Sequence, residues 1–428
     1  MNIKRIIPYI LSLSMLAGCG GHVGTAELSE PVPVTTAQTE NNSSETTAEA
    51  TVPENTQASA AVPTGSAVLS VSESAEVYDR ITLGELIDNP AIQLENGDEI
   101  VDTSETGVFE ITARYIMDGV LYEQNVEYTV EDTTAPILLN SGNGAEIKCG
   151  KTFDLTDYVG FGDNYDRNPR LTYTGQVDTS VCGTYPLEAT VTDASGNSTS
   201  WNVKIKVVDE LSAPEDNNPR VQFSDFIERY AGTDVCFGID VSKWQGNIDF
   251  EAVKNAGCSF VIMRIGHYYD EYTVDEYYRA NMAAAKAAGL DVGVYLYTTA
   301  NSEEKARENA QWIAEMLDGE ELDFPIAFDW ESFSNFQQYG MSINDLNEYY
   351  EAFKDETERL GYSAMLYSSK NFLNNFWYEH SDSTIWLAHY TDETDYTGRY
   401  SIWQASCYGN IDGIYGDVDM NILYSKEQ

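Results

Sequence analysis

From residue 237 to residue 423, short apolar runs alternate with longer amphipathic stretches, and this rhythm constrains the fold more than any other feature of the chain. Runs such as SFVIMRIG and DVGVYLYTT are rich in β-branched and aromatic residues, and the second is followed by the helical pattern SEEKARENAQWIAEMLDG. Alternating strands and helices predict parallel strands joined by crossover helices. Five such strand and helix pairs, followed by three strands almost without helices, predict a closed α/β barrel of (β/α)5β3 type over residues 236–428.

Four acidic residues fall on the predicted strands of this barrel: Asp240 on the first, Asp329 and Glu331 at the end of the fourth, and Asp419 on the eighth. The loops that follow the strands of such a barrel converge on one face, so we expect the four carboxylates to meet there. Residues two apart on a strand share a face, which places Asp329 and Glu331 in one small volume, where like charges raise one of the two pKa values. A solvated acidic rim is the alternative, but it would not require apolar and aromatic flanks.

Aromatic residues lie at the equivalent ends of several predicted strands. Sugar rings stack on aromatic faces, and cleavage of a glycosidic bond needs a protonated acid. A cleft that combines carboxylates with aromatic rings is therefore typical of a glycosidase. The aromatic residues expected to contact a sugar are Tyr295, Tyr297, Trp330, Trp386, Tyr390 and Trp403.

Five motifs carry a resemblance to a known family. They are DVSKWQG (240–246), FDWES (328–332), WLAHY (386–390), WQAS (403–406) and DVDMN (417–421). In this order they resemble the successive motifs of glycoside hydrolase family 25, the β/α-barrel lysozymes. The resemblance implies a β-1,4-N-acetylmuramidase that needs no cofactor and hydrolyses peptidoglycan between N-acetylmuramic acid and N-acetylglucosamine.

The resemblance also implies a role for each acid. Glu331 matches the general acid and base of the family, and Asp329 matches the neighbouring acid that orients the acetamido group of the substrate. Asp240 and Asp419 match two further acids that line the cleft, and Gln404 of the WQAS motif is expected to bind substrate. Glu331 needs a raised pKa to donate a proton near neutrality, and we expect an ionised Asp329 to provide it.

Two other functions remain open. The first is a surface adhesin that binds glycan through an inactive barrel, although the presence of all four acids argues against it. The second is another glycosidase, such as a chitinase or a glucosaminidase. A chitinase would be expected to carry a DxxDxDxE strand, whereas Phe324 and Ala327 stand where the first two acids of that pattern would be.

The first twenty residues, MNIKRIIPYILSLSMLAGCG, combine a basic start with a short apolar run and the ending Leu-Ala-Gly-Cys. The run is too short to span a bilayer, and its ending resembles a bacterial lipoprotein signal. We expect residues 1–18 to be removed and Cys19 to be lipidated.

Residues 19–67 are rich in Thr, Ser, Glu and Pro, which predicts a disordered tether. Together these features predict an extracytoplasmic protein of the cell envelope with a lipid anchor in the membrane.

Two similar segments follow the tether. VDTSETGVFEITARYIMDG (101–119) is echoed by VDTSVCGTYPLEATVTDAS (177–195), and a strand-like alternation follows each of them. The repeat predicts two all-β immunoglobulin-like sandwiches, which act as spacers or adhesive domains, at residues 68–133 and 134–210. We expect residues 211–235 to be a linker to the barrel.

The cysteines allow one pairing to be predicted. Cys149 and Cys182 are the only two in the second module, and in an exported chain this favours a disulfide between them. The pairing of Cys236, Cys258 and Cys407 stays open.

The remaining composition excludes several partners. A net charge of −46 disfavours binding to nucleic acid. With four histidines and no HExxH or CxxC spacing, the sequence predicts no metal site. We interpret the Asp-rich loop GDNYDRN (162–168) as a solvated turn rather than a calcium site. We expect a monomer, although the sequence leaves the oligomeric state open.

Overall fold

The computed structural model describes residues 69–71, 73–87, 89, 92–212 and 219–425. The chain divides into two compact units, of which one ends at Glu131 and the other begins at Asp132. The predicted signal peptide, the lipidation site Cys19 and the predicted tether lie outside the described residues. In the part of the chain that the structure describes, none of the helices has the length and apolar character needed to cross a membrane.

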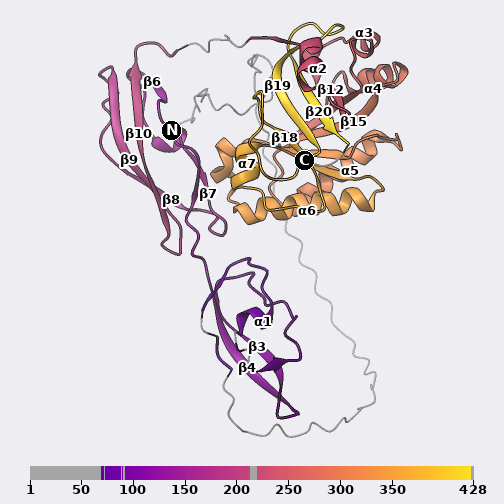
Figure 1. The fold of residues 1–428 in the computed structure, drawn as a ribbon. Helices are drawn as coiled ribbons and strands as arrows, with labels where there is room; N and C mark the ends of the chain where they lie inside the picture. The colour runs from indigo at the N-terminus through magenta and orange to yellow at the C-terminus, as the bar shows by residue number, and fades with distance from the viewer. Residues whose placement is uncertain (1–68, 72, 88, 90–91, 213–218, 426–428) are drawn as a thin grey trace, which may run out of the picture. The chain divides into compact units, whose positions relative to one another are not determined.

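Eight strands of the C-terminal domain pair in a closed ring. Figure 1 shows this domain in red, orange and yellow. Each strand pairs with the next along the chain, and the last pairs with both its predecessor and the first, which closes the barrel. The strands are β12 (Val235–Val241), β13 (Phe260–Tyr268), β15 (Asp291–Thr298), β16 (Ile326–Trp330), β17 (Ala364–Ser369), β18 (Thr384–Ala388), β19 (Ile402–Asn410) and β20 (Val418–Tyr424).

The last strand departs from the expectation of parallel strands. β20 runs antiparallel to both β12 and β19, whereas the other neighbours in the ring are parallel. An antiparallel strand enters the barrel at the end where the parallel strands leave it. Asp419, the second residue of β20, therefore lies at the carboxyl end of β12, as the expected meeting of acids requires.

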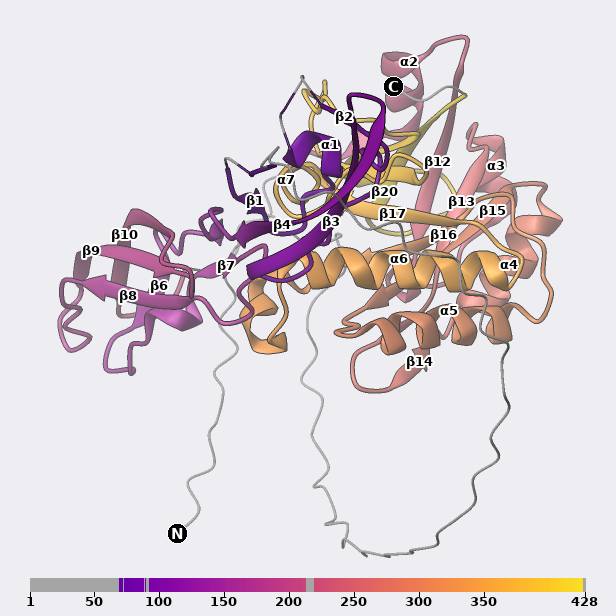
Figure 2. The same cartoon turned by 90° about the horizontal axis from the view of Figure 1, so that it is seen from below.

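The predicted helical stretches form helices after the first five strands. These are α3 (Phe250–Asn255), α4 (Tyr278–Ala287), α5 (Glu303–Leu317), α6 (Ile343–Arg359) and α7 (Lys370–Asn375). Ser302 and Ser342 cap α5 and α6 by accepting a hydrogen bond from a first-turn N–H group, which begins each helix at a defined residue. α5 and α6 lie side by side (Figure 2). The structure adds a short strand, β14 (Tyr272–Val274), and two 3₁₀ segments, η2 (Lys243–Gln245) and η3 (Ser332–Tyr339).

Two apolar cores lie on the two faces of the barrel wall. Along β16, Phe328 and Trp330 belong to the core shared with the helices, whereas Ala327 belongs to a smaller core built from strand residues alone. Side chains alternate between the faces of a strand, so Asp329 points to the barrel interior, like Ala327. Burial of each large apolar side chain stabilises the fold by about 1.5–3 kcal/mol.

Part of the predicted linker 211–235 is folded, contrary to expectation. β11 (Val221–Gln222) pairs with β19, and α2 (Phe223–Tyr230) packs on the barrel. The ring of Phe226 lies 5.8 Å from that of Phe237, and Tyr230 lies 5.5 Å from Trp403. These contacts make the segment part of the barrel domain.

The sequence repeat corresponds to a repeated sheet order. The sheet of the first module contains four strands in the order β1 (Ala75–Glu76), β4 (Val120–Glu131), β3 (Gly107–Met117) and β2 (Gln93–Leu94). The short helix α1 (Leu83–Leu86) lies between β1 and β2 along the chain. The second module repeats it with β6 (Glu146–Lys148), β10 (Ser198–Val208), β9 (Gly183–Thr192) and β8 (Arg170–Thr174). A second sheet, β5 (Ile137–Asn140) with β7 (Gly160–Gly162), and the 3₁₀ turn η1 (Leu155–Asp157) complete the second module.

The predicted disulfide of the second module is not formed in the structure. Cys149 and Cys182 are free thiols whose sulfurs lie within 4.8 Å of each other and of a carboxylate oxygen of Asp209. Cys182 Sγ donates to Asp209 Oδ1 at 3.2 Å. The proximity is compatible with a bridge, which stays a prediction.

Candidate active site

Two of the four predicted acids face each other across the seam of the barrel. Asp240 of β12 and Asp419 of β20 are direct partners in the antiparallel register, so their side chains leave the sheet on the same face. Both are buried, with 5% and 8% of their surface exposed. The sheet therefore holds two carboxyl groups next to each other in a place with little water.

Asp240 is held by two amide groups. Gln404 Nε2 and Asn421 Nδ2 each donate to Asp240 Oδ2 at 2.8 Å. Burial raises the pKa of Asp240 to about 6, although the hydrogen bonds from Asn421 and Gln404 act to lower it. Asp240 therefore changes charge just below neutral pH.

A second layer of donors fixes the direction of these amides. The hydroxyls of Tyr367 and Tyr390 donate to Gln404 Oε1 at 2.9 and 2.8 Å, and Trp386 Nε1 donates to Asn421 Oδ1 at 2.8 Å. Because each amide oxygen is engaged, each amide nitrogen is turned toward Asp240. Sequence reasoning missed Tyr367 and Asn421, although Asn421 lies two residues after Asp419 and hence on the same face.

Asp329 and Glu331 form the other acidic pair. Asp329 is 4% exposed on the interior face of β16, and Glu331 is half-buried where the chain leaves the strand and enters η3. Burial is the first cause that raises the pKa of Asp329 well above its ordinary value, and the charge of Glu331 and a hydrogen bond with it raise it further. This shift favours the protonated form of Asp329, which is opposite to the expected ionised Asp329. How the proton is divided between Asp329 and Glu331 stays a prediction.

Arg264 is a cation that sequence reasoning missed. It lies on β13, its Nε and Nη2 atoms donate to Asp275 Oδ2 at 2.9 and 2.8 Å, and its charge lowers the pKa of Asp329. Its position in the middle of an apolar strand was the available signal, because a buried arginine needs a carboxylate partner. Arg264 limits the excess of negative charge in the site.

Tyr295 shows that the acids converge. Its half-buried ring contacts Trp386 edge-on at 6.2 Å. Burial raises the pKa of its hydroxyl and Arg264 lowers it, while Asp240, Asp329 and Asp419 all raise it. One hydroxyl group therefore lies within electrostatic reach of three of the predicted acids. Glu331 joins them through its hydrogen bond with Asp329.

Tyrosines line the exposed side of this cluster. Tyr269 is 53% exposed, and its ring lies 5.6 Å from Tyr297 and 5.1 Å from His267. Asp329 and Glu331 are among the charges that raise its pKa, after burial, which is the largest cause. Tyr269 directly follows β13, so it is an aromatic residue at a strand end, which was the available signal for it in the sequence. Tyr390 is 42% exposed and offers a second accessible ring.

Three tryptophans predicted to contact a sugar have no accessible face. Trp330, Trp386 and Trp403 are at most 3% exposed, and their indole N–H groups donate to Ala300 O, Asn421 Oδ1 and His389 O. Trp330 and Trp403 belong to the core outside the barrel wall, and Trp386 belongs to the inner core. The prediction of sugar stacking on these three rings is therefore wrong. Gln404 was also expected to bind substrate, but it is only 2% exposed, and its amide donates a hydrogen bond to Asp240 instead.

The arrangement suits proton transfer to a bound sugar. Asp329, whose pKa is raised by burial, is more deeply buried than its hydrogen-bond partner Glu331, and Asp240 and Asp419 are placed to oppose positive charge. Tyr269, Tyr297 and Tyr390 provide the rings on which a sugar can stack.

Comparisons with known proteins agree with this chemistry. Residues 239–414 match the model of the family described as "Glycosyl hydrolases family 25", and residues 137–207 match "Bacterial surface protein, Ig-like domain". "Autolytic lysozyme" of Clostridium acetobutylicum is 29% identical over 188 residues, which is 43% of this chain and 54% of that protein. "Lysozyme M1" of Streptomyces globisporus is 30% identical over 202 residues, 43% of this chain and 66% of that protein.

The matches cover only part of these relatives. This chain spans about half the length of the first and about two thirds of the second. Among solved structures, the bacterial lysozyme from Streptomyces coelicolor aligns with 44% of this chain and 92% of its own length, at 25% identity and a TM-score of 0.37.

Proposed function

We propose that this chain, whose residues 239–414 form a glycosyl hydrolases family 25 domain, is a lysozyme that hydrolyses the β-1,4 bond between N-acetylmuramic acid and N-acetylglucosamine in peptidoglycan. The observation that carries the proposal is the hydrogen-bonded pair of Asp329 and Glu331, which lies within electrostatic reach of the accessible Tyr269. The two relatives named as lysozymes support the choice of substrate.

The first step is protonation of the leaving group. Glu331, the more accessible acid of the pair, receives the shared proton from Asp329 through their hydrogen bond and gives it to the glycosidic oxygen. The bond between that oxygen and the anomeric carbon breaks, and Asp329 is left ionised. Positive charge develops on the sugar ring and is opposed by the carboxylates of Asp240 and Asp419.

The second step returns the proton. The ionised Asp329 orients the acetamido group of the substrate, whose oxygen attacks the anomeric carbon, a role that rests on the family resemblance. Water then attacks the same carbon, and Glu331 accepts its proton as a general base. Two displacements at one carbon retain its configuration.

The finer assignments belong to the same proposal. The barrel is of (β/α)5β3 type, and residues 68–133 form a further immunoglobulin-like module, in addition to the matched one. The chain is exported, is anchored through a lipid on Cys19, and holds its catalytic domain at the cell wall as a monomer. The motif Leu-Ala-Gly-Cys supports the anchor, and labelling of the protein with a radioactive fatty acid, with Cys19→Ala as the control, tests it.

The test is mass spectrometry of the fragments released from purified sacculi. The full chain is expected to release muropeptides with a reducing N-acetylmuramic acid, and Glu331→Gln is expected to release them about 10²- to 10⁴-fold more slowly. Reducing N-acetylglucosamine would indicate a glucosaminidase instead. If sacculi bind the protein and no fragment appears, the domain is an inactive glycan-binding module.

A further inference from the structure

Asp163 and Asp193 of the second immunoglobulin-like module lie together with Asp132, which directly precedes that module, and away from the acids of the barrel. Asp132, Asp163 and Asp193 each place a carboxylate oxygen within 4.8 Å of those of the other two. They are 6%, 0% and 7% exposed. Buried carboxylates are ordinarily paired with a cation or bound to a metal, because an isolated buried charge is costly.

Local hydrogen bonds fix the directions of two of these carboxylates. Asp163 Oδ1 accepts from the N–H groups of Tyr165 and Asp166 at 3.0 and 2.6 Å, and Asp193 Oδ1 accepts from those of Gly196 and Asn197 at 2.6 and 2.8 Å. The other oxygen of Asp193, Oδ2, accepts from Asn197 Nδ2 at 3.0 Å. The turn of Asp163 uses only its Oδ1.

The second oxygen of Asp163 points to a ligand. Asp163 Oδ2 is fully buried and has no hydrogen-bond partner among the described residues. A buried carboxylate oxygen without a partner costs free energy unless something binds it. The sequence-based interpretation of residues 162–168 as a solvated turn is therefore wrong for Asp163.

The spacing of the oxygens fits one ion. Ca²⁺ binds carboxylate oxygens at about 2.3–2.6 Å, so two oxygens on opposite sides of the ion lie about 4.6–5.2 Å apart. The three oxygens lie within 4.8 Å of one another, so a single Ca²⁺ can reach all of them. We propose that Asp132, Asp163 and Asp193 bind one Ca²⁺, with water or neighbouring oxygens completing its six to eight ligands.

The electrostatics of the cluster agree with this geometry. Burial raises the pKa of Asp163 to about 6 despite its two backbone hydrogen bonds, and Asp132 and Asp193 both raise it further. A bound divalent cation removes the repulsion among the three carboxylates.

The same loop contacts the catalytic domain, which gives the site a structural consequence. Asp163 O accepts from the N–H of Ile343 at 2.8 Å, and Arg167 binds both oxygens of Asp345 at 2.7 and 2.8 Å. Ile343 begins α6, which directly follows the segment after Glu331. Ca²⁺ at Asp163 therefore stiffens the loop that docks on the N-terminus of α6.

Calorimetry of the full chain, treated with a chelator and then dialysed, tests the proposal. Titration with CaCl₂ is expected to give one site per chain, and saturating Ca²⁺ is expected to raise the unfolding midpoint of the second module by about 4 °C or more. Asp163→Asn is expected to abolish both effects. Asp178→Asn is the matched control, because Asp178 makes the same kind of turn with Ser180 in this module but is exposed.

Three results would overturn the assignment. They are no heat of binding in the wild type, equal binding by the wild type and Asp163→Asn, and binding of Mg²⁺ in preference to Ca²⁺. Asp132→Asn, which leaves the turns of Asp163 and Asp193 intact, is the second variant in case Asp163→Asn does not fold. Loss of Ca²⁺ binding with an unchanged circular dichroism spectrum in Asp132→Asn supports the site, and unchanged affinity contradicts it.

Discussion

Asp240 and Asp419 lie directly opposite each other on neighbouring strands that run in opposite directions. The reversal of β20 brings the start of one strand to the end of the other, so residues 179 positions apart share one face of the barrel. Two amide donors hold Asp240, yet burial still raises its pKa to about 6. Burial therefore disfavours the ionised form of Asp240, and buried acids with shifted pKa values are typical of binding and catalytic sites.

The first prediction is that Asp240→Asn stabilises the protein at the expense of activity. The folded-state pKa of about 6 lies above the ordinary 3.8, so the favourable protonated form is present below about pH 4 and is lost as the pH rises through 6. The variant should therefore be more stable than the wild type by about 1–3 kcal/mol at pH 7.5, and nearly equal to it at pH 4. Urea unfolding of the barrel at both pH values measures this, and the same difference at both would contradict it.

The second prediction concerns Gln404 as a positioning residue. Gln404→Leu removes one of the two donors that lower the pKa of Asp240, so that pKa should rise by about 1 unit. If hydrolysis needs ionised Asp240, the acidic limb of the kcat/KM profile moves up by the same amount. A residue that only supports the fold would lower the rate equally at every pH. Gln404→Asn, which keeps an amide, should recover part of the shift.

The third prediction separates two aromatic residues at strand ends. Trp330 is fully buried and Tyr269 is 53% exposed beside Asp329. Trp330→Ala should cost about 3–5 kcal/mol of stability, because it opens a cavity outside the barrel wall. Tyr269→Ala should leave the unfolding midpoint unchanged and raise KM about tenfold, the equivalent of about 1.4 kcal/mol of lost binding.

Matched variants make this comparison decisive. Tyr269→Phe keeps the ring and should keep a KM near that of the wild type. A rise in KM for Trp330→Phe without loss of stability would show that Trp330 contacts the substrate after all.

The barrel and the meeting of its acids could be predicted from the sequence because both follow from short-range periodicity. The alternation of apolar runs and amphipathic stretches predicts alternating strands and helices. The position of the acids on the predicted strands indicates that their carboxylates meet on one face of the barrel. The same period of two shows why Trp330 was misplaced. It lies one residue from Asp329 and must face the opposite side of β16, toward the helices.

Other features depend on contacts that no local pattern contains. The raised pKa of Asp329 is caused first by its burial in the barrel interior, which depends on the packing of strands far apart in the sequence. Asp132, Asp163 and Asp193 lie about 30 residues apart in sequence, and only the sandwich brings them together. Helix α2 carries few signals of its own, and its place is set by Phe237 and Trp403 on the barrel.

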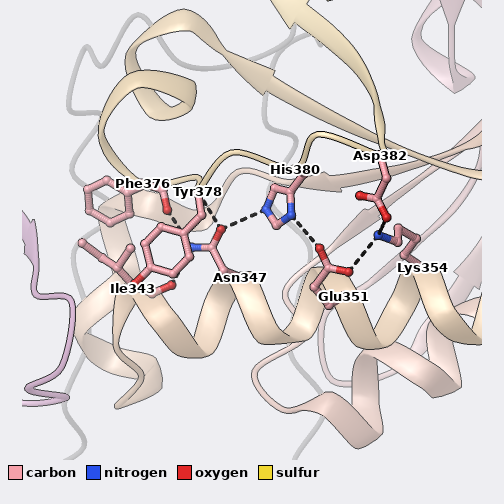
Figure 3. A network of polar contacts seen from close by, with 8 residues as sticks. All are labelled: Ile343, Asn347, Glu351, Lys354, Phe376, Tyr378, His380 and Asp382. Carbon is pink, nitrogen blue, oxygen red and sulfur yellow. Dashed lines mark hydrogen bonds and ion pairs between the residues drawn. The ribbon is translucent and has the colours of Figure 1, made fainter. Parts of the chain in front are cut away.

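A polar network on the outside of the barrel leads to a further prediction (Figure 3). His380 Nδ1 lies 2.6 Å from Glu351 Oε1, and Lys354 Nζ lies 2.9 Å from Glu351 Oε2 and 2.7 Å from Asp382 Oδ2. Asn347 Oδ1 contacts His380 Nε2 at 3.0 Å and extends the network along α6. These contacts tie α6 to the segment before β18.

The fourth prediction is that Glu351→Gln weakens the barrel at pH 6 and has little effect at pH 2.5. The hydrogen bond with His380, followed by that with Lys354, lowers the pKa of Glu351 from 4.5 to about 2. The stabilisation is present above pH 4.5 and is lost as the pH falls toward 2. Because Glu351 is 43% exposed, solvent screening limits the effect to about 0.5–1 kcal/mol. Denaturant unfolding at the two pH values checks this, with Asp355→Asn, exposed on the same helix, as the control. An equal loss at both pH values would mean that Glu351 acts through packing rather than through its charge.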